Sequence, residues 1–144
     1  MRAFGLDVGT RTVGVALSDP LGITAQTLTT LRRGGLRADL AALRKLAEAY
    51  EVTHAVVGLP LNMDGSEGAS AARSRAFGEA LGKALAVPVE YWDERLSTVA
   101  ANRALRESDL SAERRRAVVD QVAAALILQS WLDAQRGTRE EDLE

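Results

Sequence analysis

The chain has 144 residues, with 47% hydrophobic and 26% charged content and a net charge of −2 at pH 7, values typical of one globular domain. It contains no cysteine and a single histidine, His54, which excludes disulfides, thiolate catalysis, cysteine-based zinc sites and sites built from several histidines. Nothing in the sequence resembles a signal peptide or a membrane span, so a cytoplasmic protein without a membrane partner is expected.

Hydrophobic periodicity predicts strands and helices in a regular order. They are strands over 3–8, 13–18 and 22–30, a helix over 36–50, a strand over 54–58, a helix over 69–86, a strand over 87–92, and helices from about 98 to 107 and 112 to 135. Three meandering strands followed by two β-α crossovers predict an α/β domain in three layers, with a mixed sheet between helices. The domain is expected to span residues 1–137, with residues 138–144 as an acidic, flexible tail.

Three carboxylates are candidates for a site. Asp7 interrupts the first apolar strand, where a carboxylate is unfavourable unless it is compensated. Glu94 follows the fifth strand, and the carboxyl ends of parallel strands carry ligand sites in α/β sheets. Asp120 shares a face of the apolar last helix with Ala124 and Ile127, so it is expected to face the sheet.

Three converging carboxylates need compensation. Two unit charges about 4 Å apart repel by about 4 kcal/mol at an effective dielectric constant of 20, so either the pKa values rise or cations enter. Oxygen ligands without histidine or cysteine select Mg²⁺ or Mn²⁺. Two such ions can clamp a phosphodiester and activate water, so the pattern predicts a hydrolytic phosphate site.

Each of these acids also has a simpler interpretation. Asp120 could accept a hydrogen bond from a nearby cap or pair with an arginine, and Glu94 could lie in a solvated loop beside Arg95. Asp93 and Glu94 are adjacent, and neighbouring side chains of an extended chain point to opposite sides. Only one of the two is therefore expected to face the site, and Glu94 has the longer reach.

Basic residues accompany the acids. Arg11 closely follows Asp7 and could contact phosphate oxygens. Residues 114–116 are three arginines just ahead of Asp120, which suits a nucleic-acid backbone, although a solvated helix face is the alternative. Aromatic residues do not interleave with the basic ones, so base stacking is not indicated. Residues 32–35 predict a basic, flexible loop.

Four motifs occur in order along nearly the whole chain. They are Asp7 to Ala16, Val57 to Ser66, Asp93 to Thr98, and Val119 to Ala124 with Ile127 to Gln129. Together they resemble the YqgF family, whose members are described as proposed pre-16S ribosomal RNA nucleases and as Holliday junction resolvase homologues. The resemblance implies a ribonuclease H-like fold in a bacterial cytoplasmic protein, with a five-stranded mixed sheet in the order 3-2-1-4-5 and strand 2 antiparallel.

The resemblance also implies the roles of individual residues. The family's acidic positions fall on Asp7, Glu94 and Asp120, as catalytic and metal-binding residues. In the wider ribonuclease H superfamily the second acid commonly ends the fourth strand, where this chain has Gly58, so Asp64 is a reserve candidate for the second ligand. The nucleic-acid contacts would be Arg11, Arg95, Arg114, Arg115 and Arg116.

The sequence therefore predicts a hydrolase, an endonuclease dependent on Mg²⁺ or Mn²⁺ that processes the 5′ end of pre-16S rRNA in ribosome biogenesis. Structured RNA is the first expected partner and junction DNA the second, with the protein a monomer or homodimer. Two alternatives are a Holliday junction resolvase acting on DNA and a non-catalytic RNA-binding factor of ribosome assembly or transcription. The Asp-x-Gly-Thr motif at Asp7 also resembles the phosphate loop of actin-like ATPases, but the chain is too short for their two lobes.

Overall fold

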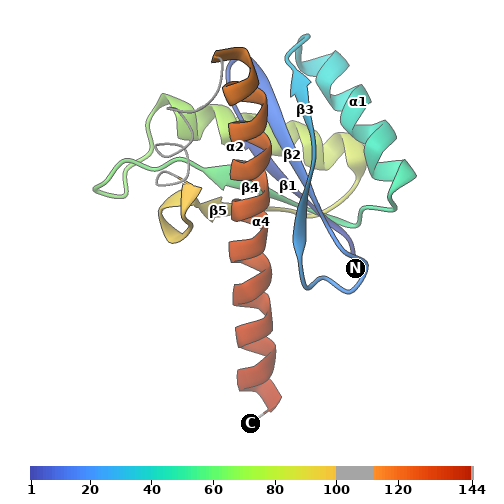
Figure 1. The fold of residues 1–144 in the computed structure, drawn as a ribbon, viewed down its shortest axis with the longest axis vertical. Coiled ribbons are helices and arrows are strands. Elements are labelled where there is room, and N and C mark those ends of the chain that lie inside the picture. The colour runs from blue at the N-terminus through green and yellow to red at the C-terminus, as the bar shows by residue number, and fades with distance from the viewer. Residues whose placement is uncertain (100–111, 144) are drawn as a thin grey trace.

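The computed structural model describes residues 1–99 and 112–143, without the side chains of 112–117 and 139–143 (Figure 1). The strands are β1 (Ala3–Val8), β2 (Thr12–Ser18), β3 (Ala25–Arg32), β4 (His54–Leu59) and β5 (Val89–Asp93). The helices are α1 (Leu36–Ala49), α2 (Ala69–Leu85) and α4 (Ala112–Leu143), with a 3₁₀ turn η1 (Glu94–Leu96). The helix predicted over 98–107 falls mostly on residues outside the described part.

The sheet confirms the predicted topology. Its strand order is β3-β2-β1-β4-β5, with β2 antiparallel to both β1 and β3 and with β4 parallel to β1 and β5. Strand β3 begins later than predicted, because Gly22 has a positive φ of 70° and the Asp19 carboxylate accepts hydrogen bonds from the amides of Ile23 and Thr24 at 2.6 and 3.2 Å. These contacts form a turn in place of the first predicted strand residues.

Alternation along the strands divides the core between the two faces of the sheet. On one face Phe4 and Leu6 of β1 pack with helices α1 and α2. On the other face Ala3 belongs to the cluster around α4, and Gly5 lies so close to α4 that an added Cβ would be 2.6 Å from the carbonyl oxygen of Ala124. Small residues on this face therefore let α4 approach the backbone of the sheet.

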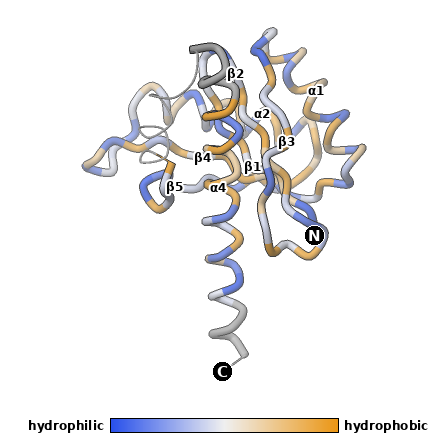
Figure 2. The backbone as a smooth tube through the Cα atoms, viewed as in Figure 1, coloured by the Kyte–Doolittle hydropathy of each residue, from blue (hydrophilic) through white to orange (hydrophobic). Residues whose placement is uncertain are grey.

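Helix α4 covers the second face. Ala124, Ile127 and Trp131 are buried, which confirms the predicted packing face, and the helix runs across the sheet in Figure 1. It continues to Leu143, beyond the predicted end near residue 135, and the coloured part of its C-terminal half already extends past the sheet in Figure 2. In the part of the chain that the structure describes, no helix is both long and apolar enough to cross a membrane.

Candidate active site

Asp7 and Asp120 are both neighbours of Gly14 on β2. Asp7 is 8% exposed and is paired directly opposite Gly14 across β1 and β2, so both residues face the same side of the sheet. A Cβ added to Gly14 would lie 2.0 Å from the carbonyl oxygen and 3.0 Å from the Cβ of Asp120. The absent side chain of Gly14 thus lets α4 bring Asp120 onto the residue that pairs with Asp7.

Glu94 reaches the same face over β4, the strand that flanks β1 on the side away from β2. Gly58 lies one residue beyond the parallel pair of Leu6 with Val57, and hence beside Asp7. A Cβ added to Gly58 would lie 2.9 Å from Oε1 of Glu94. The Glu94 carboxylate therefore occupies the space that a side chain at Gly58, near the end of β4, would fill. Although Glu94 follows β5 in the sequence, its carboxylate thus lies at the end of β4.

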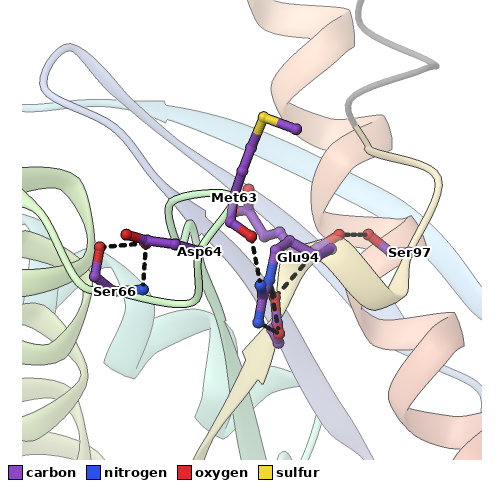
Figure 3. A network of polar contacts seen from close by, with 7 residues as sticks. Met63, Asp64, Ser66, Glu94 and Ser97 are labelled. Atoms are coloured by element: carbon purple, nitrogen blue, oxygen red, sulfur yellow. Dashed lines mark hydrogen bonds and ion pairs between the residues drawn. The ribbon is translucent and has the colours of Figure 1, made fainter.

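The neighbouring acid Asp93 is turned to a different partner. Its carboxylate accepts hydrogen bonds from the amide of Arg95 at 2.9 Å and from Nη2 of Arg95 at 2.8 Å. The hydrogen bond from the guanidinium lowers the pKa of the Asp93 carboxyl and raises the pKa of Arg95. Arg95 Nη1 also donates to the carbonyl oxygen of Met63 at 3.2 Å, which ties η1 to the loop after β4 (Figure 3).

Asp64, the reserve ligand, is engaged within its own loop. Figure 3 shows its side chain turned toward Ser66 and away from Glu94, and its Oδ1 accepts hydrogen bonds from the hydroxyl and the amide of Ser66 at 2.6 and 2.9 Å. The hydroxyl contact is the main cause of a lowered pKa of the Asp64 carboxyl. This geometry gives Asp64 a role in shaping the loop and no support as a ligand beside Asp7.

Thr12 is a site residue that the sequence interpretation does not single out. Its hydroxyl donates a hydrogen bond to Oδ2 of Asp120. Thr12 and Gly14 are two residues apart on β2 and therefore share a face, which is the signal that could have found it. The simpler interpretation of Asp120 as a hydrogen-bond acceptor finds its donor here, 108 residues away in the sequence.

The donor set suits a hard divalent cation, since Asp7, Glu94 and Asp120 offer only carboxylate oxygens. As the side chains stand in this structure, however, no three histidine, cysteine, aspartate or glutamate side chains among the described residues lie in an arrangement that holds one metal ion. The three acids are thus gathered on one face but not drawn together. A cation shared by them would have to compete with Thr12 for Asp120.

The turn after Asp7 is tied down by Arg33. The amide of Arg33 donates to the carbonyl oxygen of Arg11 at 2.8 Å, and its Nη1 donates to the carbonyl oxygen of Gly9 at 2.8 Å. Asp39, only 4% exposed, holds Nε of Arg33 at 2.7 Å and accepts from the amide of Gly34 at 2.9 Å. The prediction of a flexible loop is therefore wrong for this segment.

The other predicted nucleic-acid contacts differ in their surroundings. Arg11 is exposed at the turn between β1 and β2. Arg95 is ion-paired with Asp93, so its part in binding nucleic acid stays a prediction. Residues Arg114, Arg115 and Arg116 belong to the first turns of α4, and their side chains lie outside the described part.

Removing the Asp39 carboxylate is expected to destabilise the fold. Asp39→Ala leaves Nε of Arg33 and the Gly34 amide without their acceptor. We expect a loss of about 3 kcal/mol, because breaking a buried ion pair from one side is costly. Urea denaturation measures it. The matched control is Glu48→Ala, which removes an exposed pair with Arg44 on the same helix and should cost less than about 1 kcal/mol. Equal effects of the two changes would refute the bracing role of Asp39.

The fold has a solved counterpart. A solved structure of T. thermophilus RuvC in complex with a Holliday junction substrate superimposes with a TM-score of 0.60, covering 96% of this chain and 97% of that chain at 13% sequence identity. The likeness shows a ribonuclease H-like fold.

A family model described as RuvX, Holliday junction resolvase, matches residues 1–134. The chain belongs to this family, which is the YqgF family that its four sequence motifs resemble. A relative from Myxococcus xanthus is 64% identical over 136 residues, covering 94% of this chain and 90% of its own length. A relative from Moorella thermoacetica is 61% identical over 133 residues, covering 92% of this chain and 95% of its own length. Both carry the name "Putative pre-16S rRNA nuclease".

Proposed function

We propose that this protein is a cytoplasmic, divalent-metal-dependent endonuclease that hydrolyses phosphodiester bonds of structured RNA and processes the 5′ end of pre-16S rRNA. One observation carries the proposal. Asp7, Glu94 and Asp120 come from three separate elements onto one face of the sheet, where Gly14 leaves space for the backbone of Asp120 and Gly58 for the carboxylate of Glu94. The names of the relatives support RNA as the substrate.

Each residue has a part in the proposed reaction. Asp7, fixed on a central strand, and Asp120, on a buried helix, would hold the ions between them. Bound cations would polarise the phosphodiester and favour deprotonation of the attacking water. Glu94 would complete the coordination and orient that water by accepting its hydrogen bond. Arg11, exposed at the adjoining turn, would hold a phosphate oxygen of the substrate.

A Holliday junction resolvase is the second candidate. It is favoured by the description of the matching family and by the likeness of the fold to RuvC. It requires a dimer that cuts four-way junctions symmetrically, whereas processing of an RNA end needs no such symmetry. A non-catalytic RNA-binding factor is the third candidate function, and it requires no catalytic role for Asp7, Glu94 and Asp120.

Parallel assays separate these functions. Purified protein is incubated with a labelled precursor of 16S rRNA and with a four-way DNA junction, each with Mg²⁺, with Mn²⁺ or with EDTA. We expect metal-dependent cleavage of the RNA and none of the junction. Symmetric cleavage confined to the junction would favour the resolvase. RNA binding without hydrolysis in either metal would contradict the nuclease and favour the binding factor.

A further inference from the structure

Arg32 is an exposed arginine at the end of β3, in the neighbourhood of the three acids Asp7, Glu94 and Asp120. Within the described part of the chain it forms no ion pair and no side-chain hydrogen bond. Its neighbour Arg33 is by contrast held by Asp39. A permanently charged guanidinium, which is less strongly hydrated than an ammonium and here has no internal partner, is available for an external anion.

The register of the sheet places Arg32 on the face of the candidate active site. Arg32 is paired directly opposite Thr12 across β2 and β3, and opposite residues of an antiparallel pair face the same side. Thr12 donates its hydroxyl hydrogen bond to Asp120, which identifies that side as the one covered by α4. The side chain of Arg32 thus starts from the same face as the three acids.

Strand geometry gives the scale of the separation. Asp7 lies opposite Gly14, which lies opposite Thr30, and Arg32 is two residues further along β3. With strands about 4.8 Å apart and a rise of about 3.3 Å per residue, the Cα atoms of Asp7 and Arg32 are about 12 Å apart. Phosphates of one strand of a duplex follow each other every 3.4 Å or so along the axis, so Arg32 is a few phosphates from the acids.

We propose that Arg32 contacts a backbone phosphate of the nucleic-acid substrate, so that the bound strand passes from the acids across the turn of β1 and β2 to the edge of the sheet at β3. The turn and the end of β3 lie at the same end of the molecule in Figure 1. Arg11 is exposed at this turn, and its carbonyl oxygen accepts the amide of Arg33, so a second arginine lies next to the end of β3. This inference rests on the proposed function only in taking nucleic acid as the ligand.

The test is a salt titration of binding, with EDTA present so that no cleavage occurs. A fluorescein-labelled RNA hairpin is titrated with wild type, Arg32→Gln and Arg32→Lys, and the association constant is measured by fluorescence anisotropy at several salt concentrations. Loss of one phosphate contact should make the negative slope of log K against log salt shallower by about 0.7 to 0.9 and weaken binding severalfold. Arg32→Lys keeps the charge and should retain most of the slope.

The matched control is Lys45→Gln, which removes the same charge at an exposed position of α1, on the opposite face of the sheet. Its slope should equal that of wild type, and thermal unfolding should show that all variants are folded. An unchanged slope in Arg32→Gln, or an equal loss in Lys45→Gln, would overturn the proposal. Absence of hydrolysis in the cleavage assays, with the Arg32 effect intact, would instead refute the nuclease and leave the phosphate contact standing.

Discussion

Asp7→Asn is expected to slow single-turnover cleavage of precursor RNA by a factor of about a thousand or more. The asparagine keeps the size of the side chain but removes a charged oxygen ligand for the cations. Stabilisation of transition-state charge by bound metal amounts to several kcal/mol, and about 4 kcal/mol corresponds to a thousandfold in rate. Cleavage is measured with enzyme in excess over labelled RNA, so that product release does not limit the rate.

The same variant should remain folded and should still bind RNA. Asp7 is nearly buried and is paired with Gly14, on which Asp120 packs. Removing a negative charge from this neighbourhood relieves repulsion, so the melting temperature should stay equal or rise. Asp133→Asn, which alters an exposed acid near the other end of α4, is the control and should cleave like wild type. Cleavage by Asp7→Asn at the wild-type rate would remove Asp7 from the reaction.

Gly14→Ala should have the largest effect on stability. The new Cβ would lie 2.0 Å from the carbonyl oxygen and 2.3 Å from the carbonyl carbon of Asp120. Both are backbone atoms, so no side-chain rotation relieves the contact, and α4 must move away from the sheet. We expect a loss of about 3 kcal/mol or more in the free energy of unfolding, at the upper end of overpacking effects, as measured by urea denaturation.

Displacement of α4 also moves Asp120 relative to Asp7. A misplacement of about 1 Å can cost a hundredfold in rate, so the folded fraction of Gly14→Ala should cleave about a hundred times more slowly. The control is Gly137→Ala in α4, because nothing lies within 4 Å of its added Cβ. This change should stabilise the protein by up to about 1 kcal/mol. Wild-type stability and activity in Gly14→Ala would contradict the close approach of β2 and α4.

Much of the fold and part of the site follow from local patterns in the sequence. The alternation in β1 places Asp7 opposite the apolar face of Phe4 and Leu6, and the helical spacing in α4 groups Asp120 with buried Ala124 and Ile127. Chain order and crossover rules then restrict the sheet to few topologies. These features depend on periodicity, which a single sequence carries.

Contacts between residues far apart in the chain could not be predicted in this way. No periodicity shows that the Glu94 carboxylate fills the space over Gly58, or that Thr12 donates to Asp120. Likewise, the pairing of Arg33 with Asp39 decides that the loop after β3 is held in place, while its composition alone indicates flexibility. In each case a side chain has several chemically reasonable partners, and only the folded backbone selects one.

Diffraction from a crystal soaked in Mn²⁺, with data collected for the anomalous signal of manganese, tests the central claim most directly. We expect anomalous density between Asp7 and Asp120, with Glu94 at its edge and with Asp120 turned from Thr12 toward the ion. Asp120 still bonded to Thr12 at saturating Mn²⁺, with no manganese between the carboxylates, would contradict the assignment of these acids as the metal-binding site.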